Sequence, residues 1–265
     1  VECQTAQAQG RILANPVSAL RSNPPEANTA VDGYGFAYAG GAAGTQVLPL
    51  VAGRSAAGVP FAAKVPAGHA VRVLTGAALP DGVDTVVLDE DVTASATQIA
   101  FRGPLKRGAN TRQAGEDIVK GSEALPAGRL LTPADLALLS AVGCAQVPVR
   151  ARLRVAVLST GDELREVGQD AGSGQIFDAN RPMLLSLATR WGFEPVDLGR
   201  VGDDRNALRA VFDEGAARAD VILTSGGASA GDEDHVSALL RATGALQMWR
   251  IALKPGRPLA LAMWQ

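Results

Sequence analysis

Three loops in the second half of the chain together supply acids, hydroxyls, glycines and cations, a set that suits an anionic ligand and a metal ion. The first, TGDEL, begins at Thr160 and places the carboxylates of Asp162 and Glu163 directly after an apolar run. Carboxylates at such a place bind a metal ion or cap a helix, and the string alone favours the cap. The other two loops shift the balance towards binding.

The second loop, TSGGASAGDED at 224–234, joins a glycine-rich stretch to serines and acids. Small residues let backbone amides approach a phosphate group, and the hydroxyls of Ser225 and Ser229 add donors. The acids that follow would repel a phosphate unless a divalent cation lay between them, so the loop indicates Mg²⁺. The alternative, a glycine turn before a helix cap, explains neither the serines nor the run of acids.

The third loop, RIALKPGRP at 250–258, sets cationic side chains around a turn stiffened by proline and glycine. Such a turn suits an anion, with Lys254 between an apolar strand and the rigid turn, whereas a solvated basic loop remains the alternative for Arg257. Two further acids, Asp203 and Asp204, follow another strand. One is expected to cap the next helix and the other can face the same ligand, and the sequence does not decide between them.

The elements expected around these loops are buried strands that alternate with amphipathic helices. Apolar runs such as VAVL and DVIL alternate with helical patterns from about residue 152 onward, which is the βαβ rhythm of a parallel sheet. Ligands of such sheets bind beyond the carboxyl ends of the strands, where connecting loops meet. We therefore predict a three-layer α/β/α domain with a mostly parallel sheet over 151–265.

The first half of the chain has a different residue pattern, with short β-like runs between glycine and proline turns. This pattern predicts a β-rich module with few helices. One helix is expected after Thr132, which can cap it, with Pro133 at its first position. We predict an inserted β-rich domain over 34–116 and a small linking α+β segment built from 1–33 and 117–150.

Length and composition exclude several classes of protein. The 265 residues are 47% hydrophobic and 20% charged, as in ordinary soluble proteins, and no apolar run approaches the length of a membrane span. A net charge of -2 and a pI near 5.8 argue against nucleic acid as a partner. Two distant cysteines predict neither a zinc site nor a disulfide framework. Walker and dinucleotide glycine patterns are missing, and no secretory signal is visible, so a cytoplasmic protein is expected.

Two turns in the first half, around Asp32 and Thr75, are explained by turn chemistry when taken alone. Read in order, however, the strings of the chain resemble the molybdopterin molybdenumtransferases, the family that includes the gephyrin E domain. Any one string is weak, but their succession covers nearly the whole chain. The strings are GRILA, AVDGYG, VRVLTGAALPDGVDTVV, GEDI, TPADLALLSAVG, VAVLSTGDEL, GQIFDAN, ADVILTSGGASAGDED and ALKPGRPLA.

The resemblance implies an enzyme that inserts molybdate into adenylylated molybdopterin and releases AMP, with Mg²⁺ required. It also implies a homodimer whose active site lies between the nucleotide-fold domain of one subunit and the small β domain of the other. Position by position, it implies catalytic roles for Asp32, Thr75, Asp117, Glu163, Asp203, Asp234 and Lys254. The implied metal ligands are Glu163, Asp232 and Asp234. The residues expected to bind the pterin nucleotide are Thr160, Gly161, Asp162, Ser225, Gly226, Gly227, Ser229, Gly231, Arg250, Lys254, Gly256 and Arg257.

The chain departs from the family pattern in a few places. Val31 and Gly35 stand where the family usually has Met and Ala, and Arg250 stands where many members have Lys, which keeps the charge but changes its geometry. The chain stops at Gln265, where members continue into a GLPGNP loop and a further β domain, so we expect that domain and the donors of that loop to be absent. The alternative functions are a non-catalytic molybdopterin-binding paralogue that carries the cofactor, and a protein scaffold.

Overall fold

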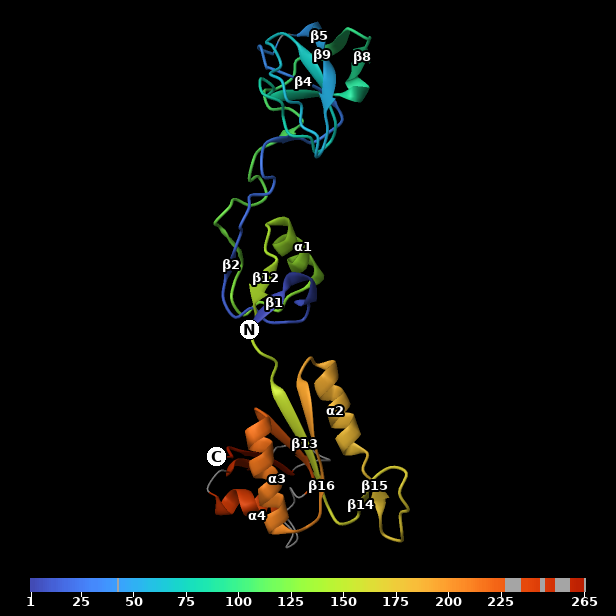
Figure 1. The fold of residues 1–265 in the computed structure, drawn as a ribbon, viewed down its shortest axis with the longest axis vertical. Coiled ribbons are helices and arrows are strands. Elements are labelled where there is room, and N and C mark those ends of the chain that lie inside the picture. Colours follow the sequence, from blue (N-terminus) through green and yellow to red (C-terminus); the bar gives the residue numbers. More distant parts are fainter. Residues whose placement is uncertain (42, 227–234, 244–245, 251–257, 265) are drawn as a thin grey trace. The chain divides into compact units, whose positions relative to one another are not determined.

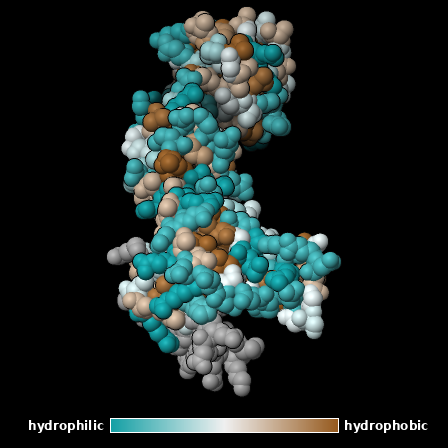
Figure 2. Space-filling model, turned by 60° about the horizontal axis from the view of Figure 1, so that its bottom comes forward, coloured by the Kyte–Doolittle hydropathy of each residue, from teal (hydrophilic) through white to brown (hydrophobic). Residues whose placement is uncertain are grey.

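The structure of the chain is a computed structural model, drawn as a ribbon in Figure 1. It describes residues 1–41, 43–226, 235–243, 246–250 and 258–264. Hydrophilic residues cover most of the face shown in Figure 2, and hydrophobic residues gather in smaller patches between them. None of the helices within the described ranges combines the length and the apolar composition needed to cross a bilayer.

The chain divides into two compact units, Val1–Arg150 (unit 1) and Ala151–Gln265 (unit 2). Unit 1 contains separate clusters of buried side chains, one around helix α1 (Pro133–Ala141) and two within a sheet. Unit 2 has a cluster of its own between its sheet and two helices. Each unit therefore has an independent hydrophobic core.

A six-stranded sheet forms the β-rich module that the sequence predicts, with the strand order β7-β4-β6-β5-β9-β8. All neighbours pair antiparallel except β5 with β6. Rings of Phe36 and Phe101 stack at 5.2 Å between centroids inside one cluster, and valines fill the other. The strands are β4 (Gly33–Phe36), β5 (Gly44–Ser55), β6 (Ala70–Val73), β7 (Thr85–Leu88), β8 (Val92–Ala94) and β9 (Gln98–Gly103), with the short η2 (Asp89–Asp91) after β7.

The linking part of unit 1 consists of chain segments that run out to the six-stranded sheet and back. The outgoing strands pair antiparallel with the returning ones, as β1 with β12, β2 with β11 and β3 with β10. Leu13, Leu131 and Leu139 fill its core. The elements are β1 (Glu2–Gln4), η1 (Thr5–Gln7), β2 (Val17–Ser18), β3 (Asn28–Thr29), β10 (Thr111–Arg112), β11 (Glu123–Leu125), α1 (Pro133–Ala141) and β12 (Gln146–Pro148).

The predicted start of α1 is confirmed. Thr132 caps the helix, with Pro133 at its first position, and Asp135 completes a capping box by accepting a hydrogen bond from the Thr132 backbone N–H at 2.8 Å. Arg129 donates to the same carboxylate, which is almost fully buried. The helix ends before Gly143, whose φ of +85° is a left-handed conformation that glycine adopts without strain.

Unit 2 has the predicted α/β/α class. Its sheet has the order β16-β13-β17, and both pairings are parallel. Helices α3 and α4 pack on Leu158 of β13, whereas α2 packs against β13 and β16. The central strand is buried from Val155 to Thr160, as its unbroken apolar run predicts. The elements are β13 (Arg154–Thr160), α2 (Asn180–Arg190), β16 (Glu194–Val201), α3 (Arg205–Arg218), β17 (Val221–Ser225) and α4 (His235–Ala242).

The remaining strands of unit 2 form two small pairs. Strands β14 (Leu164–Arg165) and β15 (Ile176–Phe177) pair in parallel. Strands β18 (Leu246–Arg250) and β19 (Pro258–Ala262) pair antiparallel with each other, although the sequence pattern placed both in the parallel alternation. Only residues 251–257 connect them, which is too short for the crossover that a parallel pair requires.

Candidate functional site

The carboxyl ends of β13, β16 and β17 lie at one edge of the unit 2 sheet. The strand register pairs Ser159 with both Arg200 and Ser225, and Thr160 with Val201. The loop TGDEL leaves β13, GDD leaves β16 and SGG leaves β17. The parallel pairing therefore brings the starts of two predicted loops, TGDEL and the glycine-rich loop, together with GDD, at the place where such sheets bind ligands. Residues 251–257 of the third predicted loop lie outside the described part of the chain.

Two acids at this edge, Asp162 and Asp203, each accept a hydrogen bond from the other's backbone N–H. The Asp203 N–H donates to Asp162 Oδ1 at 3.1 Å, and the Asp162 N–H donates to Asp203 Oδ2 at 3.4 Å. A Cβ at Gly202 would lie 2.6 Å from Asp162 Oδ1, so a larger residue there would shift the Asp162 carboxylate. The neighbouring Asp204 instead caps α3, accepting from the Ala207 N–H at 2.7 Å. The structure thus assigns Asp204 to the helix and turns Asp203 towards the TGDEL loop.

Two arginines that the sequence analysis did not single out tie down the TGDEL loop. Arg200 donates to the Gly161 carbonyl at 3.2 Å, and Arg165 donates to the Leu164 carbonyl at 2.8 Å. Glu163 is exposed, and its carboxylate lies so close to Gly161 that a Cβ there would be 2.3 Å from Oε2. A larger residue at position 161 would therefore displace the Glu163 carboxylate. It would also be strained, because Gly161 has a φ of +140°.

Thr160 and Gly226 meet where β13 and β17 end. A Cβ at Gly226 would lie 2.3 Å from the Thr160 carbonyl oxygen and 2.7 Å from its hydroxyl, and Gly226 has a φ of +101°. The Thr160 hydroxyl is buried and has no hydrogen-bond partner among the residues that the structure describes. Glycine at 226 therefore permits the close approach of these two strand ends.

The string GQIFDAN supplies a polar group that the sequence analysis left without a role. Asn180, the first residue of α2, donates from Nδ2 to the Ser225 hydroxyl at 2.8 Å. Asp178 accepts from the Arg181 N–H at 3.1 Å and from its Nε at 3.2 Å. Burial of the Asp178 carboxyl works to raise its pKa, but hydrogen bonds, chiefly from Arg181, outweigh it and hold the pKa below the usual value. An Asp two residues before the first residue of a helix was the signal available in the sequence.

In unit 1 the structure brings Asp32 and Thr75 together. The Thr75 N–H donates to Asp32 Oδ1 at 2.6 Å and its hydroxyl donates to the same oxygen at 2.7 Å. These two hydrogen bonds, the backbone one first, lower the pKa of the exposed Asp32 carboxyl. A Cβ at Gly33 would lie 1.9 Å from the Val87 carbonyl oxygen, so the glycine of the DGYG string is required by the packing of β4 on β7.

An ion pair supports this turn from the neighbouring strands. Arg72 of β6 pairs with both oxygens of Asp89, with Nη2 at 2.8 Å from Oδ2. The guanidinium carbon lies 4.9 Å from the centre of the Tyr34 ring, a cation–π distance. The Asp89 N–H donates to the Asp32 carbonyl at 3.1 Å. The positive charge of Arg72 adds to the lowering of the Asp32 pKa.

Asp117 is held by other partners in the linking part of unit 1. Its Oδ2 accepts from Asn23 Nδ2 at 3.1 Å, and its Oδ1 accepts from Arg112. Arg112 in turn pairs in register with Asn28 across β10 and β3. Asp117 is exposed, as Asp32 and Thr75 are.

Several predicted site residues lie outside the described part of the chain. Of the three expected metal ligands, only Glu163 falls within it. Within that part, no three His, Cys, Asp or Glu side chains form a group that could hold a metal ion. Arg250 is described only as the last residue of β18. The residues not described are Gly227, Ser229, Gly231, Asp232, Asp234, Lys254, Gly256 and Arg257.

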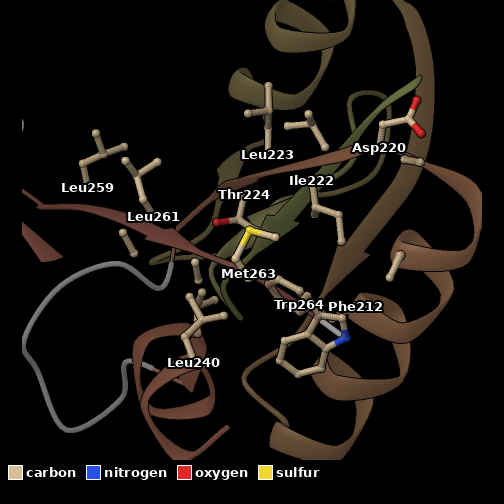
Figure 3. A pocket seen from close by; sticks show the side chains of 16 residues that line it. Phe212, Asp220, Ile222, Leu223, Thr224, Leu240, Leu259, Leu261, Met263 and Trp264 are labelled. Carbon is tan, nitrogen blue, oxygen red and sulfur yellow. The ribbon is translucent and has the colours of Figure 1, made fainter. Parts of the chain in front are cut away.

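A cavity of about 530 Å³ lies elsewhere in unit 2, between β17, β19 and the helices α3 and α4. Figure 3 shows its lining, which is mainly apolar and includes Phe212, Leu240, Leu261 and Trp264. An anionic ligand needs cations and several polar donors, and the described residues that line this cavity include no Lys, Arg or His. The polar edge of the sheet, and not this cavity, has the chemistry of the candidate site.

Comparisons with known proteins match both units of the chain to known families. Residues 1–143 match the family model "MoeA N-terminal region (domain I and II)", and residues 156–265 match "Probable molybdopterin binding domain". The chain is 40% identical over 256 residues to a molybdopterin molybdenumtransferase of Haemophilus influenzae, covering 96% of this chain and 63% of that protein. It is 36% identical to the protein of that name from Nostoc sp., covering 96% of this chain and 59% of the relative.

A solved structure has the same fold. The crystal structure of the molybdopterin biosynthesis MoeA protein from Pyrococcus horikoshii superposes with a TM-score of 0.83 at 28% identity, covering 99% of this chain and 66% of that one. The chain thus spans less than two thirds of the length of each of these relatives. Because the first family model matches more than half of the chain, the chain belongs to the MoeA family.

Proposed function

We propose that this chain acts in molybdenum cofactor biosynthesis, by binding adenylylated molybdopterin and supporting the insertion of molybdate with release of AMP. The observation that carries the proposal is the convergence of Thr160, Asp162, Asp203 and Ser225 at one edge of the unit 2 sheet. The names of the relatives and the match to a molybdopterin-binding domain support the same function.

The edge offers donors for the phosphates of such a ligand. The Ser225 hydroxyl and the glycine backbone that follows β17 are suited to bind phosphate oxygens. Gly226 has no side chain and lies close to Thr160, so no side chain at 226 blocks a ligand there. Lys254, Arg250 and Arg257 would neutralise the charge of the phosphates and of molybdate. Catalysis would then consist mainly of positioning and electrostatic stabilisation.

We also propose that Mg²⁺ takes part, held by Glu163 together with Asp232 and Asp234. The carboxylates described at this edge, Asp162, Glu163 and Asp203, are hard oxygen donors of the kind that Mg²⁺ prefers. When bound, the ion would neutralise charge on the nucleotide phosphates. The protein's own contribution is to hold Glu163 next to Gly161, with the loop carbonyls fixed by Arg165 and Arg200.

The exposed residues of unit 1 would serve the same reaction in a homodimer. Asp32, Thr75 and Asp117 are polar and accessible in a single chain, and Asp32 is already held as an anion by Thr75. In this proposal they face the nucleotide-binding edge of the partner subunit. A cytoplasmic location stays a prediction from the sequence.

An AMP-release assay tests the proposed function. The chain is incubated with adenylylated molybdopterin, molybdate and Mg²⁺, and AMP is quantified by chromatography. We expect AMP from the wild type and a loss of about a hundredfold in Glu163→Gln, as for removal of an electrostatic group from a reaction site. Glu194→Gln, an exposed Glu at the start of β16 and so at the opposite end of the sheet, is the matched control and should be unaffected. Tight pterin binding without AMP would instead identify a cofactor carrier.

A further inference from the structure

The contact between Asn180 and Ser225 links two segments that are 45 residues apart in the chain. Ser225 is the last residue of β17 and pairs in register with Ser159 of the central strand. Asn180 opens α2, the helix that packs against β13 and β16. The hydrogen bond therefore connects a helix start to the strand end from which the glycine-rich loop leaves.

The direction of this hydrogen bond matters for Ser225. A serine hydroxyl has one O–H to donate and an oxygen that accepts. The Asn180 amide donates to Ser225 Oγ at 2.8 Å, so it occupies an acceptor position and does not use the hydroxyl proton. That proton can then be donated to an oxygen of an anionic ligand beyond the strand end.

Asn180 lies in the chain between the buried Asp178 and the half-buried Arg181, which bind each other. Asp178 is 4% exposed and accepts from both the backbone and the side chain of Arg181. The Arg181 side chain is 11% exposed and also pairs with Asp197, at 2.6 Å, and with Glu166. This network fixes the first turn of α2, and with it the place of the Asn180 amide.

We infer that Asn180 is a positioning residue that orients the Ser225 hydroxyl to donate to a phosphate or pterin oxygen of the ligand. The inference rests on the proposed function for the identity of the ligand. The orientation of Ser225 by Asn180 is a property of the chain alone and can be tested without any ligand.

A double-mutant cycle tests the link to binding. Dissociation constants for molybdopterin are measured by titration calorimetry for the wild type, Asn180→Ala, Ser225→Ala and the double variant. Each single variant should bind about tenfold more weakly, as expected for the loss of one hydrogen bond to the ligand. The double variant should bind no more weakly than Ser225→Ala, because both changes remove the same interaction. Wild-type affinity in Asn180→Ala, or additive losses, would overturn the inference.

The conservative variant Asn180→Asp tests whether the direction of the hydrogen bond to Ser225 matters, apart from the size of the side chain. In Asn180→Asp the side chain keeps its size but can only accept, so it takes the Ser225 proton for itself. Its loss of affinity should equal that of Ser225→Ala while its melting temperature stays near that of the wild type. Undiminished affinity in this variant would show that the direction of the hydrogen bond is irrelevant. Thr189→Ala, which removes a hydroxyl from the other end of α2, is the control and should bind normally.

Hydrogen exchange gives a readout that needs no ligand. We expect faster amide exchange at residues 224–226 in Asn180→Ala than in the wild type or Thr189→Ala, since the end of β17 loses its tie to α2. Unchanged exchange there would contradict the positioning role. Should the wild type fail to bind molybdopterin at all, the proposed function would fail for this chain, and the exchange comparison would still decide the role of Asn180.

Discussion

Two carboxylates of this chain, Asp32 in unit 1 and Asp203 in unit 2, both accept hydrogen bonds from a loop residue, but the partners differ. Asp32 accepts two short hydrogen bonds from Thr75, at 2.6 and 2.7 Å. Asp203 accepts a longer one, at 3.4 Å, from Asp162, which is itself an acid. The first arrangement stabilises an anion without any ligand, whereas the second places two acidic side chains close together. Unit 1 therefore presents a finished group, meaning a carboxylate whose hydrogen-bond partners are in place, and under the proposed function a bound ion or substrate would complete the site of unit 2.

Each unit also contains a glycine, Gly33 or Gly226, at which the backbone of another segment comes very close. Gly33 lies in β4, paired on one side with Val73 and on the other with Leu88. Gly226 directly follows β17, at the edge where the loops begin. A Cβ at either position would meet a carbonyl oxygen, at 1.9 and 2.3 Å respectively. The two positions differ in pairing, because Gly33 lies inside a strand paired on both sides, whereas Gly226 lies beyond the end of its strand.

The largest expected effect comes from comparing these two glycines. Gly33→Ala should lower the free energy of unfolding by about 3 kcal/mol or prevent folding, because a strand paired on both sides cannot shift away from Val87. Gly226→Ala should cost less stability but weaken molybdopterin binding more, because it alters the strand end that meets Thr160. Urea denaturation and titration calorimetry measure the two quantities.

Gly58→Ala is the control for backbone strain. Gly58 has a φ of +76°, and a Cβ at this position would have no other atom within 4 Å, so the change should cost only about 1 kcal/mol. If Gly33→Ala proved as mild as this control, the close contact with Val87 would not limit the residue at 33.

The buried anchor of unit 2 gives the next effect. Asp178→Asn should lower the free energy of unfolding by about 1–3 kcal/mol at neutral pH, because a charge-assisted hydrogen bond to Arg181 is lost. The lowered pKa of Asp178 stabilises the folded chain above the usual value of 3.8, and this contribution is lost as the pH falls through the folded-state pKa. The stability difference between variant and wild type should therefore shrink below about pH 4. A difference that is constant with pH would contradict this assignment.

The neighbouring acids Asp203 and Asp204 should respond differently to substitution. Asp204→Ala removes the cap of α3 and should cost about 1 kcal/mol of stability. Asp203→Asn should leave stability within about 0.5 kcal/mol of the wild type and reduce AMP release instead. Thermal unfolding and the AMP assay together distinguish the two roles. Equal stability losses would show that both acids serve the fold.

The smallest expected effect concerns the finished group of unit 1. Thr75→Val removes the hydroxyl donor to Asp32 but keeps the backbone N–H, which contributes most to the shift. The pKa of Asp32 should rise towards 3.8 and still remain below it, as measured by NMR titration of the carboxyl carbon. An unchanged pKa would mean that the hydroxyl plays no part in holding the anion.

Local signals in the sequence predict a large part of the fold. Thr132 and Pro133 mark the start of α1 because capping depends on adjacent residues. The unbroken apolar run of β13 predicts a strand covered on both faces, and the alternation around it predicts the parallel sheet. The pairing of β18 with β19 was missed because the periodicity of a strand does not encode its direction.

The sequence predicts the site only in part, because the site depends on contacts between segments that are distant in the chain. The hydrogen bond from Asn180 to Ser225 joins segments 45 residues apart, and the tie from Arg200 to Gly161 joins segments 39 apart. The choice between Asp203 and Asp204 depends on backbone geometry at a single residue, which composition does not specify. The turns at Asp32 and Thr75 needed the family resemblance, because each turn alone is ordinary and only the fold brings them together.

The location of bound molybdopterin tests the central claim most directly. A crystal structure of this chain with molybdopterin should place the ligand at the carboxyl ends of β13, β16 and β17, with an anionic oxygen within hydrogen-bond distance of the Ser225 hydroxyl. Ligand in the apolar cavity lined by Phe212 and Trp264 would contradict the account, because the polar strand ends would then have no part in binding.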